Sequence, residues 1–294
     1  MSSAGRFAPS PSADLHIGNL RTAVLAWLFA RSSGRRFLIR VEDLDDRTHD
    51  DVASRQLADC AAIGVTWDDE PQWQSNHRER YDAVIGDLSG RDLVYECFCS
   101  RQDIRNAPRA PHAPEGAYPG TCRTLTTAQL SARRDAGRPP ALRLRSGTGE
   151  HTVTDLLHGR YTGVVDDFVL RRGDGVPAYN LAVVVDDAHS GIDQVVRGDD
   201  LLASSPRQAY LAGLLGYPQP VYAHVPLVLN ADGKRLAKRD GAVTLGELGT
   251  ARTWSLITAS LGWPAAEMAE LLELFDPASL PRQPWVYRGG TSDR

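Results

Sequence analysis

Three of the four cysteines lie close together in the sequence, which suggests metal chemistry. These are Cys97, Cys99 and Cys122. Thiolates are good zinc ligands, and either His112 or Glu115, which lie between them, could supply a fourth ligand. The clustering suggests a metal site, and zinc is the metal that such thiolates commonly bind. The alternative is three buried or surface thiols that hold no metal.

A tetrapeptide, His16-Ile17-Gly18-Asn19, lies where a predicted strand ends and a helix begins. The backbone N–H groups and the positive dipole end of a helix bind phosphate, and a glycine lets the ligand approach closely. His16 could donate a further hydrogen bond to a phosphate oxygen. The tetrapeptide therefore suggests a phosphate site, although a histidine at a helix start is more often only a cap.

Lysine is confined to one loop of the chain. Of 33 basic residues only Lys234 and Lys238 are lysine, and both fall in the segment ADGKRLAKRD with Arg235 and Arg239. A lysine ammonium is a compact point charge, whereas arginine is a planar fork. We interpret this loop as a second phosphate contact. The alternative is a solvated basic turn that follows the turn signal at residues 230–233.

The elements that must position these residues alternate between strand and helix over the first hundred residues. Hydrophobic periodicity predicts strands at residues 5–8, 36–41 and 93–99, and helices at 18–33, at 50–63 with Cys60 in the core, and around Tyr81 up to Gly90. This order is typical of a doubly wound α/β nucleotide-binding fold.

The second half of the chain begins with a change of composition. Residues 101–140 are rich in proline, glycine, arginine and alanine, which predicts an insertion or a loop-rich small domain. Strands are predicted at residues 163–170 and 181–185. A helix is predicted from Ser204 or Ser205 to Gly216, and the region after Asp240 has helical periodicity.

Composition and charge limit the functions that are open to the chain. With 294 residues, 42% hydrophobic and 24% charged, it is typical of a globular protein with one large α/β domain or two domains. The longest apolar run, residues 23–30, is far shorter than the roughly 18 residues of a membrane span, and no signal segment is evident, so we expect a cytoplasmic protein. The net charge is −4, but residues 101–145 carry +6 and the rest −10.

Together these motifs resemble the two signatures of class I aminoacyl-tRNA synthetases, with HIGN in place of HIGH and RLAKR in place of KMSKS. The segments between them are similar to the glutamyl-tRNA synthetase lineage, namely residues 6–18, 39–45, 167–179 and 195–201. After Asp240 only 54 residues remain, fewer than the roughly 150 of a helical anticodon-binding domain. In length the chain resembles the shortened paralogues, the glutamyl-queuosine tRNA(Asp) synthetase family.

The resemblance implies a Rossmann-like catalytic domain in two halves, 1–96 and 181–240. An inserted zinc-bearing subdomain, 97–180, and a small C-terminal helical region, 241–294, would complete the α/β chain without an anticodon-binding domain. The implied activity is ATP-dependent, tRNA-independent activation of L-glutamate to glutamyl-adenylate. The glutamate would then pass to the queuosine base at the wobble position of tRNA(Asp), whose anticodon stem-loop would meet the basic stretch of a monomeric protein.

The resemblance also assigns roles to particular residues. His16 and Lys238 would be catalytic, and ATP, with Mg²⁺, would bind at His16, Gly18, Asn19 and Lys238. Glutamate would bind at Arg6, Phe7, Ala8, Pro9, Ser10, Glu42, Tyr179 and Arg197. Structural Zn²⁺ would bind to Cys97, Cys99, Tyr118 and Cys122. Without the resemblance, a structural ion pair of Glu42 with Arg40 or Arg47 would be the preferred interpretation.

Departures from the family pattern leave other functions open. Asn19 replaces the second histidine of HIGH, and Ala237 and Arg239 replace both serines of KMSKS. The alternatives are a short glutamyl-tRNA synthetase that charges tRNA(Glu), an inactive RNA-binding paralogue, and a small-molecule adenylyltransferase with a similar histidine loop. Glutamate-dependent exchange between ATP and pyrophosphate distinguishes the last two from the main hypothesis.

Overall fold

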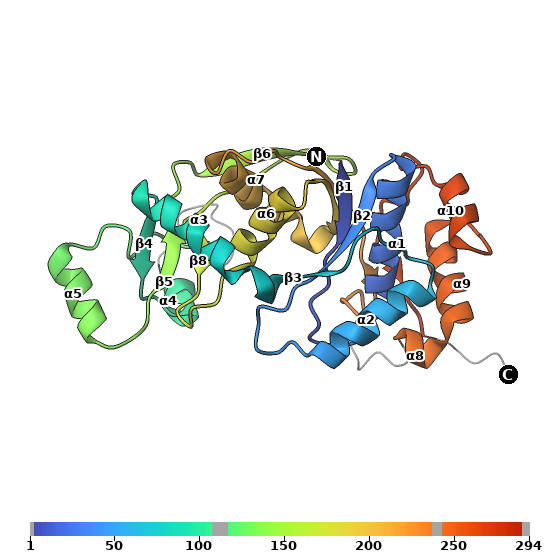
Figure 1. The fold of residues 1–294 in the computed structure, drawn as a ribbon, viewed down its shortest axis with the longest axis horizontal. Helices are drawn as coiled ribbons and strands as arrows, with labels where there is room; N and C mark the ends of the chain where they lie inside the picture. The colour runs from blue at the N-terminus through green and yellow to red at the C-terminus, as the bar shows by residue number, and fades with distance from the viewer. Residues whose placement is uncertain (1–2, 108–116, 237–242, 290–294) are drawn as a thin grey trace.

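A seven-stranded sheet forms the centre of the computed structural model, which describes residues 3–107, 117–236 and 243–289 (Figure 1). The strand order is β3-β2-β1-β9-β10-β6-β7, and neighbouring strands are parallel except for the antiparallel pair β6 and β7. The bounds are β1 Ala4–Phe7, β2 Arg36–Val41, β3 Gln72–Trp73, β6 Glu150–Asp155, β7 Gly159–Val164, β9 Ile192–Gly198 and β10 Val221–Val225. This arrangement confirms the predicted α/β class with a parallel sheet.

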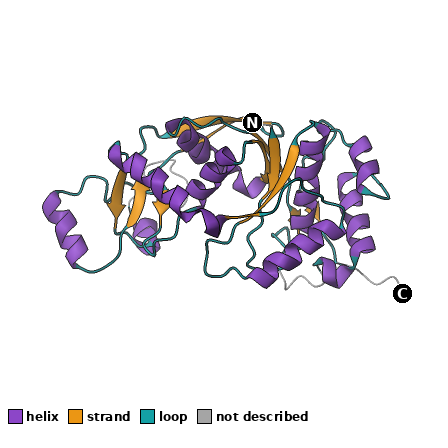
Figure 2. Cartoon of the chain, in the orientation of Figure 1, coloured by secondary structure: helices purple, strands orange, loops and turns teal. Residues whose placement is uncertain are grey.

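Helix α1 (Ile17–Ser32) is buried on nearly all sides because it lies between the sheet and the C-terminal helices (Figure 2). This explains its sequence, which is apolar around most of its circumference rather than along one stripe. Arg21 on this helix is also buried, and its guanidinium donates to Ser260 Oγ at 2.9 Å and to the Pro226 carbonyl at 2.8 Å. The bond to Ser260 attaches α1 to helix α9 (Thr250–Leu261).

The other helices beside the main sheet are amphipathic or short. They are α2 Asp50–Ala62, α3 Arg78–Gly90, α6 Tyr179–His189 and α7 Ser205–Leu214, with 3-10 turns η1 Gln74–His77 and η2 Asp199–Ser204. Cys60 on α2 is 1% exposed, as predicted for a core residue. Helix α7 has Ser204 as its N-cap and a proline in its first turn. Proline is well tolerated there because the first N–H groups of a helix have no intrahelical partner.

A second, antiparallel sheet lies at the end of the molecule remote from the C-terminal helices α9 and α10 (Met268–Leu274) (Figure 1). Its strands are ordered β4-β5-β8, with bounds β4 Val94–Cys97, β5 Ala141–Leu144 and β8 Val169–Arg171. Helices α4 (Arg101–Asn106) and α5 (Thr127–Asp135) belong to the same end of the molecule. The predicted strand at 93–99 thus exists, but it pairs here and not in the parallel sheet.

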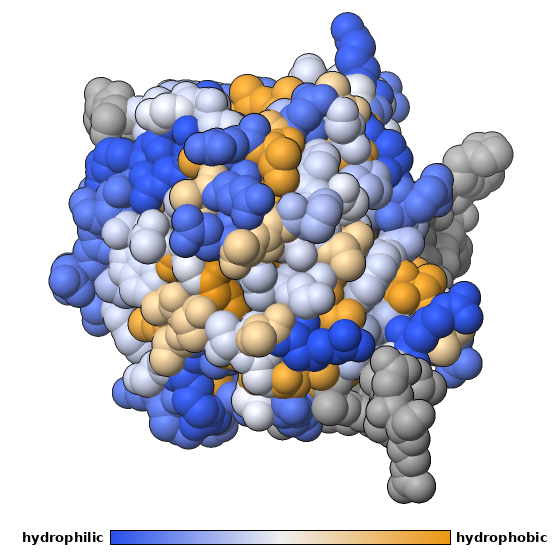
Figure 3. Space-filling model, turned by 90° about the vertical axis from the view of Figure 1, so that its right-hand side faces the viewer, coloured by the Kyte–Doolittle hydropathy of each residue, from blue (hydrophilic) through white to orange (hydrophobic). Residues whose placement is uncertain are grey.

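The C-terminal part is helical, as expected. It comprises α8 Leu245–Leu248, α9 Thr250–Leu261 and α10 Met268–Leu274, and the short strands β11 Val228–Leu229 and β12 Trp285–Val286 pair in parallel. On this side hydrophobic side chains form small patches separated by hydrophilic ones (Figure 3). Within the described ranges no helix has both the length and the apolar character that crossing a membrane requires.

Two strand predictions were wrong. Residues 181–185 are not a strand but the first half of α6. Their β-branched valines favour strands, but α6 buries both its faces, so tertiary burial overrides the local preference. The predicted strand at 163–170 is divided in two, because β7 ends at Val164 and β8 begins at Val169. Asp166 and Asp167 between them bind arginine side chains instead of joining a ladder.

Candidate active site and metal centre

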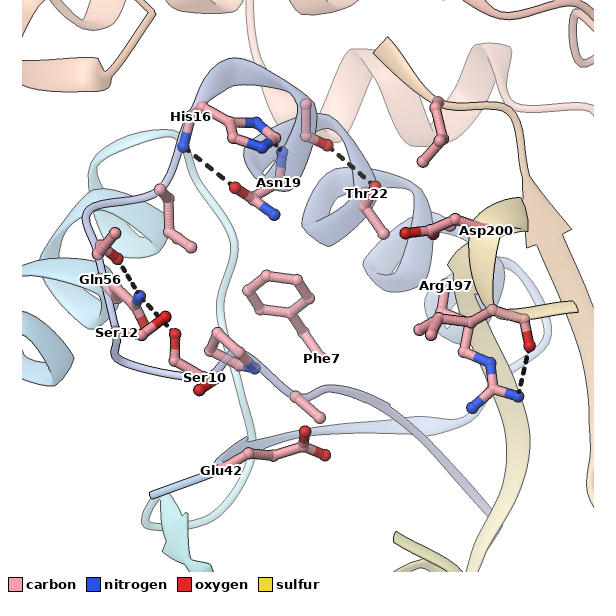
Figure 4. Close-up of a pocket in the computed structure, with 18 of the residues that line it drawn as sticks. Phe7, Ser10, Ser12, His16, Asn19, Thr22, Glu42, Gln56, Arg197 and Asp200 are labelled. Carbon is pink, nitrogen blue, oxygen red and sulfur yellow. Dashed lines mark hydrogen bonds between the residues drawn. The ribbon is translucent and has the colours of Figure 1, made fainter. Parts of the chain in front are cut away.

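A cavity of about 480 Å³ opens where β1, β2 and β9 reach their carboxyl ends (Figure 4). Ligands of open α/β sheets bind at such an edge. The residues predicted from the sequence that line this cavity are Arg6, Phe7, Ala8, Pro9, Ser10, His16, Gly18, Asn19, Glu42, Tyr179 and Arg197. The structure therefore brings together the predicted glutamate residues and the HIGN tetrapeptide. Lys238 lies outside the described residues.

His16 caps helix α1 in a reciprocal arrangement with Asn19. The His16 Nδ1 atom accepts from the Asn19 N–H at 3.2 Å, and Asn19 Oδ1 accepts from the His16 N–H at 3.2 Å. Asn19 thus occupies the third helical position of a capping box, where Glu or Gln is usual. The departure from HIGH at this position therefore has a structural role. Because Nδ1 is an acceptor, the neutral ring carries its proton on Nε2.

Burial lowers the pKa of His16 to about 4, and the nearby positive charge of Arg235 acts in the same direction. A histidine with a lowered pKa is protonated only below that value, so His16 is neutral at physiological pH. The cavity therefore has a neutral Nε2–H donor beside the N-terminus of α1. A donor of this kind can stabilise charge on a phosphate oxygen.

The two ends of the lysine loop lie beside this helix start. Leu236 and Val243 are buried in the same hydrophobic cluster as Ile17, and the Ile17 N–H donates to the Val243 carbonyl at 2.7 Å. Arg235 lines the cavity and pairs with Asp200, at 2.9 Å between Arg235 NH1 and Asp200 Oδ2. Residues 237–242, which include Ala237, Lys238 and Arg239, are not among the described residues.

A buried ion-pair network supports the floor of the cavity. Asp187 Oδ1 accepts from Arg6 Nε at 3.1 Å and from Arg40 NH1 at 2.6 Å, and Arg40 NH2 lies 3.4 Å from Glu42 Oε1. Burial acts to raise the pKa of Asp187, but Arg6 and Arg40 outweigh it and keep that pKa low. For Glu42 burial prevails over both arginines and raises the pKa.

Sequence reasoning did not identify Asp187 or Arg40 as supporting residues. The available signal was two consecutive acidic residues, Asp186 and Asp187, directly after an apolar run that contains three valines. Charged residues at the end of such a run are rarely buried without a partner. The predicted alternative for Glu42 is partly present, since Glu42 pairs with Arg40 but Arg47 pairs with Asp45.

The three clustered cysteines converge at the end of β4. Their Sγ atoms all lie within 4.8 Å of one another, and Cys99 Sγ lies 3.5 Å from Cys122 Sγ. Tyr118 Oη is 3.3 Å from Cys97 Sγ and 3.9 Å from Cys99 Sγ. Three thiols and a phenol oxygen around one point form a donor set that fits tetrahedral zinc. His112 and Glu115 fall outside the described residues.

Salt bridges and cation–π contacts occupy part of the basic stretch. Arg143 lies 3.7 Å from the ring centroid of Tyr118, Arg123 pairs with Asp167 at 2.5 Å, and Arg134 pairs with Glu96 at 2.8 Å. Five described arginines of the stretch are exposed to solvent, and four of them form none of these contacts, namely Arg101, Arg105, Arg133 and Arg138. These four are the ones available for an external anion.

Comparisons with known proteins agree with this geometry. Residues 4–275 match the family model for the catalytic domain of class I tRNA synthetases (E and Q), which defines the class of protein. The chain is 63% identical to the glutamyl-Q tRNA(Asp) synthetase of Nocardia farcinica, over 96% of this chain and 92% of the relative. It is 50% identical to that of Cutibacterium acnes, over 83% and 70%. The chain belongs to the glutamyl-Q tRNA(Asp) synthetase family, which confirms the resemblance.

A solved structure supports the same fold. A glutamate tRNA ligase from Elizabethkingia meningosepticum, solved in complex with its amino acid, superposes with a TM-score of 0.79 at 25% identity. The superposition covers 97% of this chain and 67% of that ligase. The class I catalytic fold predicted from the two signature motifs is thereby confirmed.

Proposed function

We propose that this protein activates L-glutamate with ATP and transfers it to the queuosine base of tRNA(Asp). The observation that carries the proposal is the cavity, because it joins a phosphate-binding helix start to a cluster of two arginines and one carboxylate. Relatives that are 42–63% identical and bear the name glutamyl-Q tRNA(Asp) synthetase support the same conclusion.

The charges of the cavity suit glutamate. Arg6 and Arg197 can form forked hydrogen bonds to its carboxylates, Glu42 can pair with its ammonium group, and Tyr179 and Ser10 can donate hydroxyl hydrogen bonds. Phe7, Ala8 and Pro9 complete the wall. Because Glu42 lies against Arg40 while Arg6 is held by Asp187, opposite charges occupy fixed positions for the two ends of the amino acid.

In the activation step a glutamate carboxylate oxygen attacks the α-phosphorus of ATP. A new O–P bond forms, the bond between the α-phosphorus and the bridging oxygen breaks, and pyrophosphate leaves with the electron pair. The His16 Nε2–H donates to the phosphate oxygen that gains charge, and Gly18 lets the nucleotide approach the α1 N-terminus. Lys238 supplies a second positive charge, and Mg²⁺ bound with ATP neutralises part of the triphosphate charge. Catalysis is thus positioning and charge stabilisation, without a protein nucleophile.

The cysteine cluster holds a structural zinc ion through Cys97, Cys99, Cys122 and Tyr118. When bound, zinc cross-links β4 to the segment that contains Tyr118 and Cys122 and so stabilises this end of the molecule. The exposed arginines nearby, at 101, 105, 133 and 138, contact the phosphates of the anticodon stem of tRNA(Asp).

Two assays test the function. Glutamate-dependent exchange of pyrophosphate into ATP, measured without tRNA, tests tRNA-independent activation. Transfer of labelled glutamate to purified tRNA(Asp) with and without queuosine, and to tRNA(Glu), tests the acceptor. Because a glutamate–tRNA ligase from Synechococcus sp. is 41% identical, efficient labelling of unmodified tRNA(Glu) would instead support charging of tRNA(Glu).

A further inference from the structure

Arg197, at the carboxyl end of β9, is held by three neutral side chains and by the Leu201 carbonyl, which accepts from NH2 at 3.5 Å. Its Nε donates to His224 Nε2 at 3.0 Å, its NH2 donates to Ser205 Oγ at 2.8 Å, and its NH1 donates to Tyr179 Oη at 3.2 Å. Arg197 lines the cavity, yet the residue is only 5% exposed. Each NH₂ group of a guanidinium has two N–H bonds, so NH1 has a second donor for a ligand.

This environment distinguishes Arg197 from the other arginines of the cavity. Arg6 pairs with Asp187 at 3.1 Å, and Arg235 pairs with Asp200 at 2.9 Å. Within the described ranges no carboxylate lies within ion-pair distance of Arg197. Among the described arginines that line the cavity, Arg197 is therefore the one whose positive charge no protein carboxylate contacts directly.

The imidazole ring of His224 lies between Arg197 and an aspartate, Asp155. The Arg197 Nε–H can only donate, so His224 Nε2 is the acceptor and carries no proton. The proton of the neutral ring therefore lies on Nδ1, which donates to Asp155 Oδ2 at 2.6 Å. Burial lowers the pKa of His224, so the ring stays neutral. Asp155 Oδ1 accepts from the N–H groups of Leu157 at 2.8 Å and His158 at 2.9 Å. The aspartate is thus fixed by the backbone and in turn fixes the tautomer and orientation of His224.

Serine, histidine and aspartate are also the residues of hydrolase triads, and Ser205 Oγ lies 3.1 Å from His224 Nε2. Ser205 and His224 are both 0% exposed, however, so a substrate cannot reach the hydroxyl. Among the described residues that line the cavity, Arg197 is the one that His224 and Ser205 bind through side-chain hydrogen bonds, and Asp155 acts on it through His224. The arrangement therefore supports Arg197 and does not act as a nucleophile.

We infer that Asp155, His224 and Ser205 are positioning residues that hold Arg197 for a carboxylate of the amino-acid substrate. A neutral imidazole fixes the guanidinium but leaves its charge for the ligand, whereas a direct carboxylate partner would neutralise it. The Asp155 carboxylate, on the other side of the imidazole ring, still compensates the positive charge of the buried Arg197 guanidinium. This inference rests on the proposed function, because it assigns the carboxylate that Arg197 binds to glutamate.

The test is steady-state pyrophosphate exchange with His224→Leu, which removes the acceptor for Arg197 Nε and the link to Asp155. We expect the KM for glutamate to rise about tenfold or more, since a hydrogen bond to a charged group is lost, while the KM for ATP changes little. His224→Gln, which can keep an acceptor oxygen near the Nε2 position, should recover part of the affinity. Leu211→Ala on α7 is the control, because it removes buried methyl groups without touching Arg197.

An unchanged KM for glutamate in folded His224→Leu, or an equal rise in the KM for ATP, would overturn the inference. If His224→Leu does not fold, His224→Gln and the smaller change Ser205→Ala take its place. An unchanged KM for glutamate in both of these variants would also overturn the inference. A wild-type protein without glutamate-dependent exchange would instead refute the proposed function. If the wild-type protein shows glutamate-dependent exchange but the variants keep an unchanged KM for glutamate, only the positioning role is refuted.

Discussion

His16 combines two roles that substitutions can separate. Its Nδ1 caps α1 by accepting from the Asn19 N–H at 3.2 Å, and its Nε2–H faces the nucleotide in the proposed reaction. His16→Asn keeps a good cap acceptor and removes the outer donor. His16→Ala removes both. If the two roles are independent, both variants lose catalysis, but only the alanine variant also loses helix stability.

The magnitudes follow from the two contacts. Removing one preorganised donor to a developing charge lowers kcat by about 10²- to 10³-fold, and we expect this in both variants. Loss of an N-cap costs about 1 kcal/mol, which for a domain of this size lowers Tm by about 2–4 °C in His16→Ala alone. Pyrophosphate exchange measures the first effect, and differential scanning calorimetry measures the second.

The pH dependence gives a further check on the same residue. Because the pKa of His16 is lowered to about 4, its neutral Nε2–H form persists through the range from pH 8 to pH 6. The difference in kcat between wild type and His16→Asn should therefore stay constant over that range. A difference that disappears near pH 6.5, or wild-type exchange in His16→Asn, would refute the reasoning.

Three other predictions concern the loop, the metal and the RNA. Lys238→Ala should lower the pyrophosphate exchange rate by about tenfold to a hundredfold, and Arg239→Ala should lower it less, because its charge lies farther out in the motif. Cys122→Ser should release one equivalent of zinc, as measured by elemental analysis, while circular dichroism shows that the main sheet remains folded. Arg133→Ala combined with Arg138→Ala should weaken transfer to tRNA and its salt dependence, while exchange without tRNA stays unchanged.

Each of these has a result that would contradict it. Wild-type exchange in Lys238→Ala would remove the lysine from the mechanism. Freshly purified protein without zinc, or full retention of zinc in Cys122→Ser, would rule out the cysteine site. If the two arginine substitutions changed neither transfer nor its salt slope, the phosphate contacts would have to lie elsewhere on the protein.

The sequence by itself determined the features that depend on neighbouring residues. The helix start at His16 follows from a strand, a turn and an apolar helix in direct succession, and the structure begins α1 at Ile17. The cysteine cluster was expected because Cys97 and Cys99 are separated by one residue and Cys122 follows in the same segment, 23 positions after Cys99. Local backbone preferences govern the helix start, and the shared metal chemistry of the three cysteines within one segment indicates the cluster, so residue types and spacing along the chain are sufficient to predict both.

Only the tertiary structure decided that residues 179–189 form a helix, α6, and which residues hold Arg6 and Arg197 in the cavity. The valines of α6 favour a strand locally, yet burial from both sides makes the segment helical. Arg6 and Asp187 are 181 positions apart, and His224 and Asp155 are 69 positions apart. No local preference specifies such pairs. They form because the parallel sheet brings remote strands together, and buried charges and polar groups must then find partners across it.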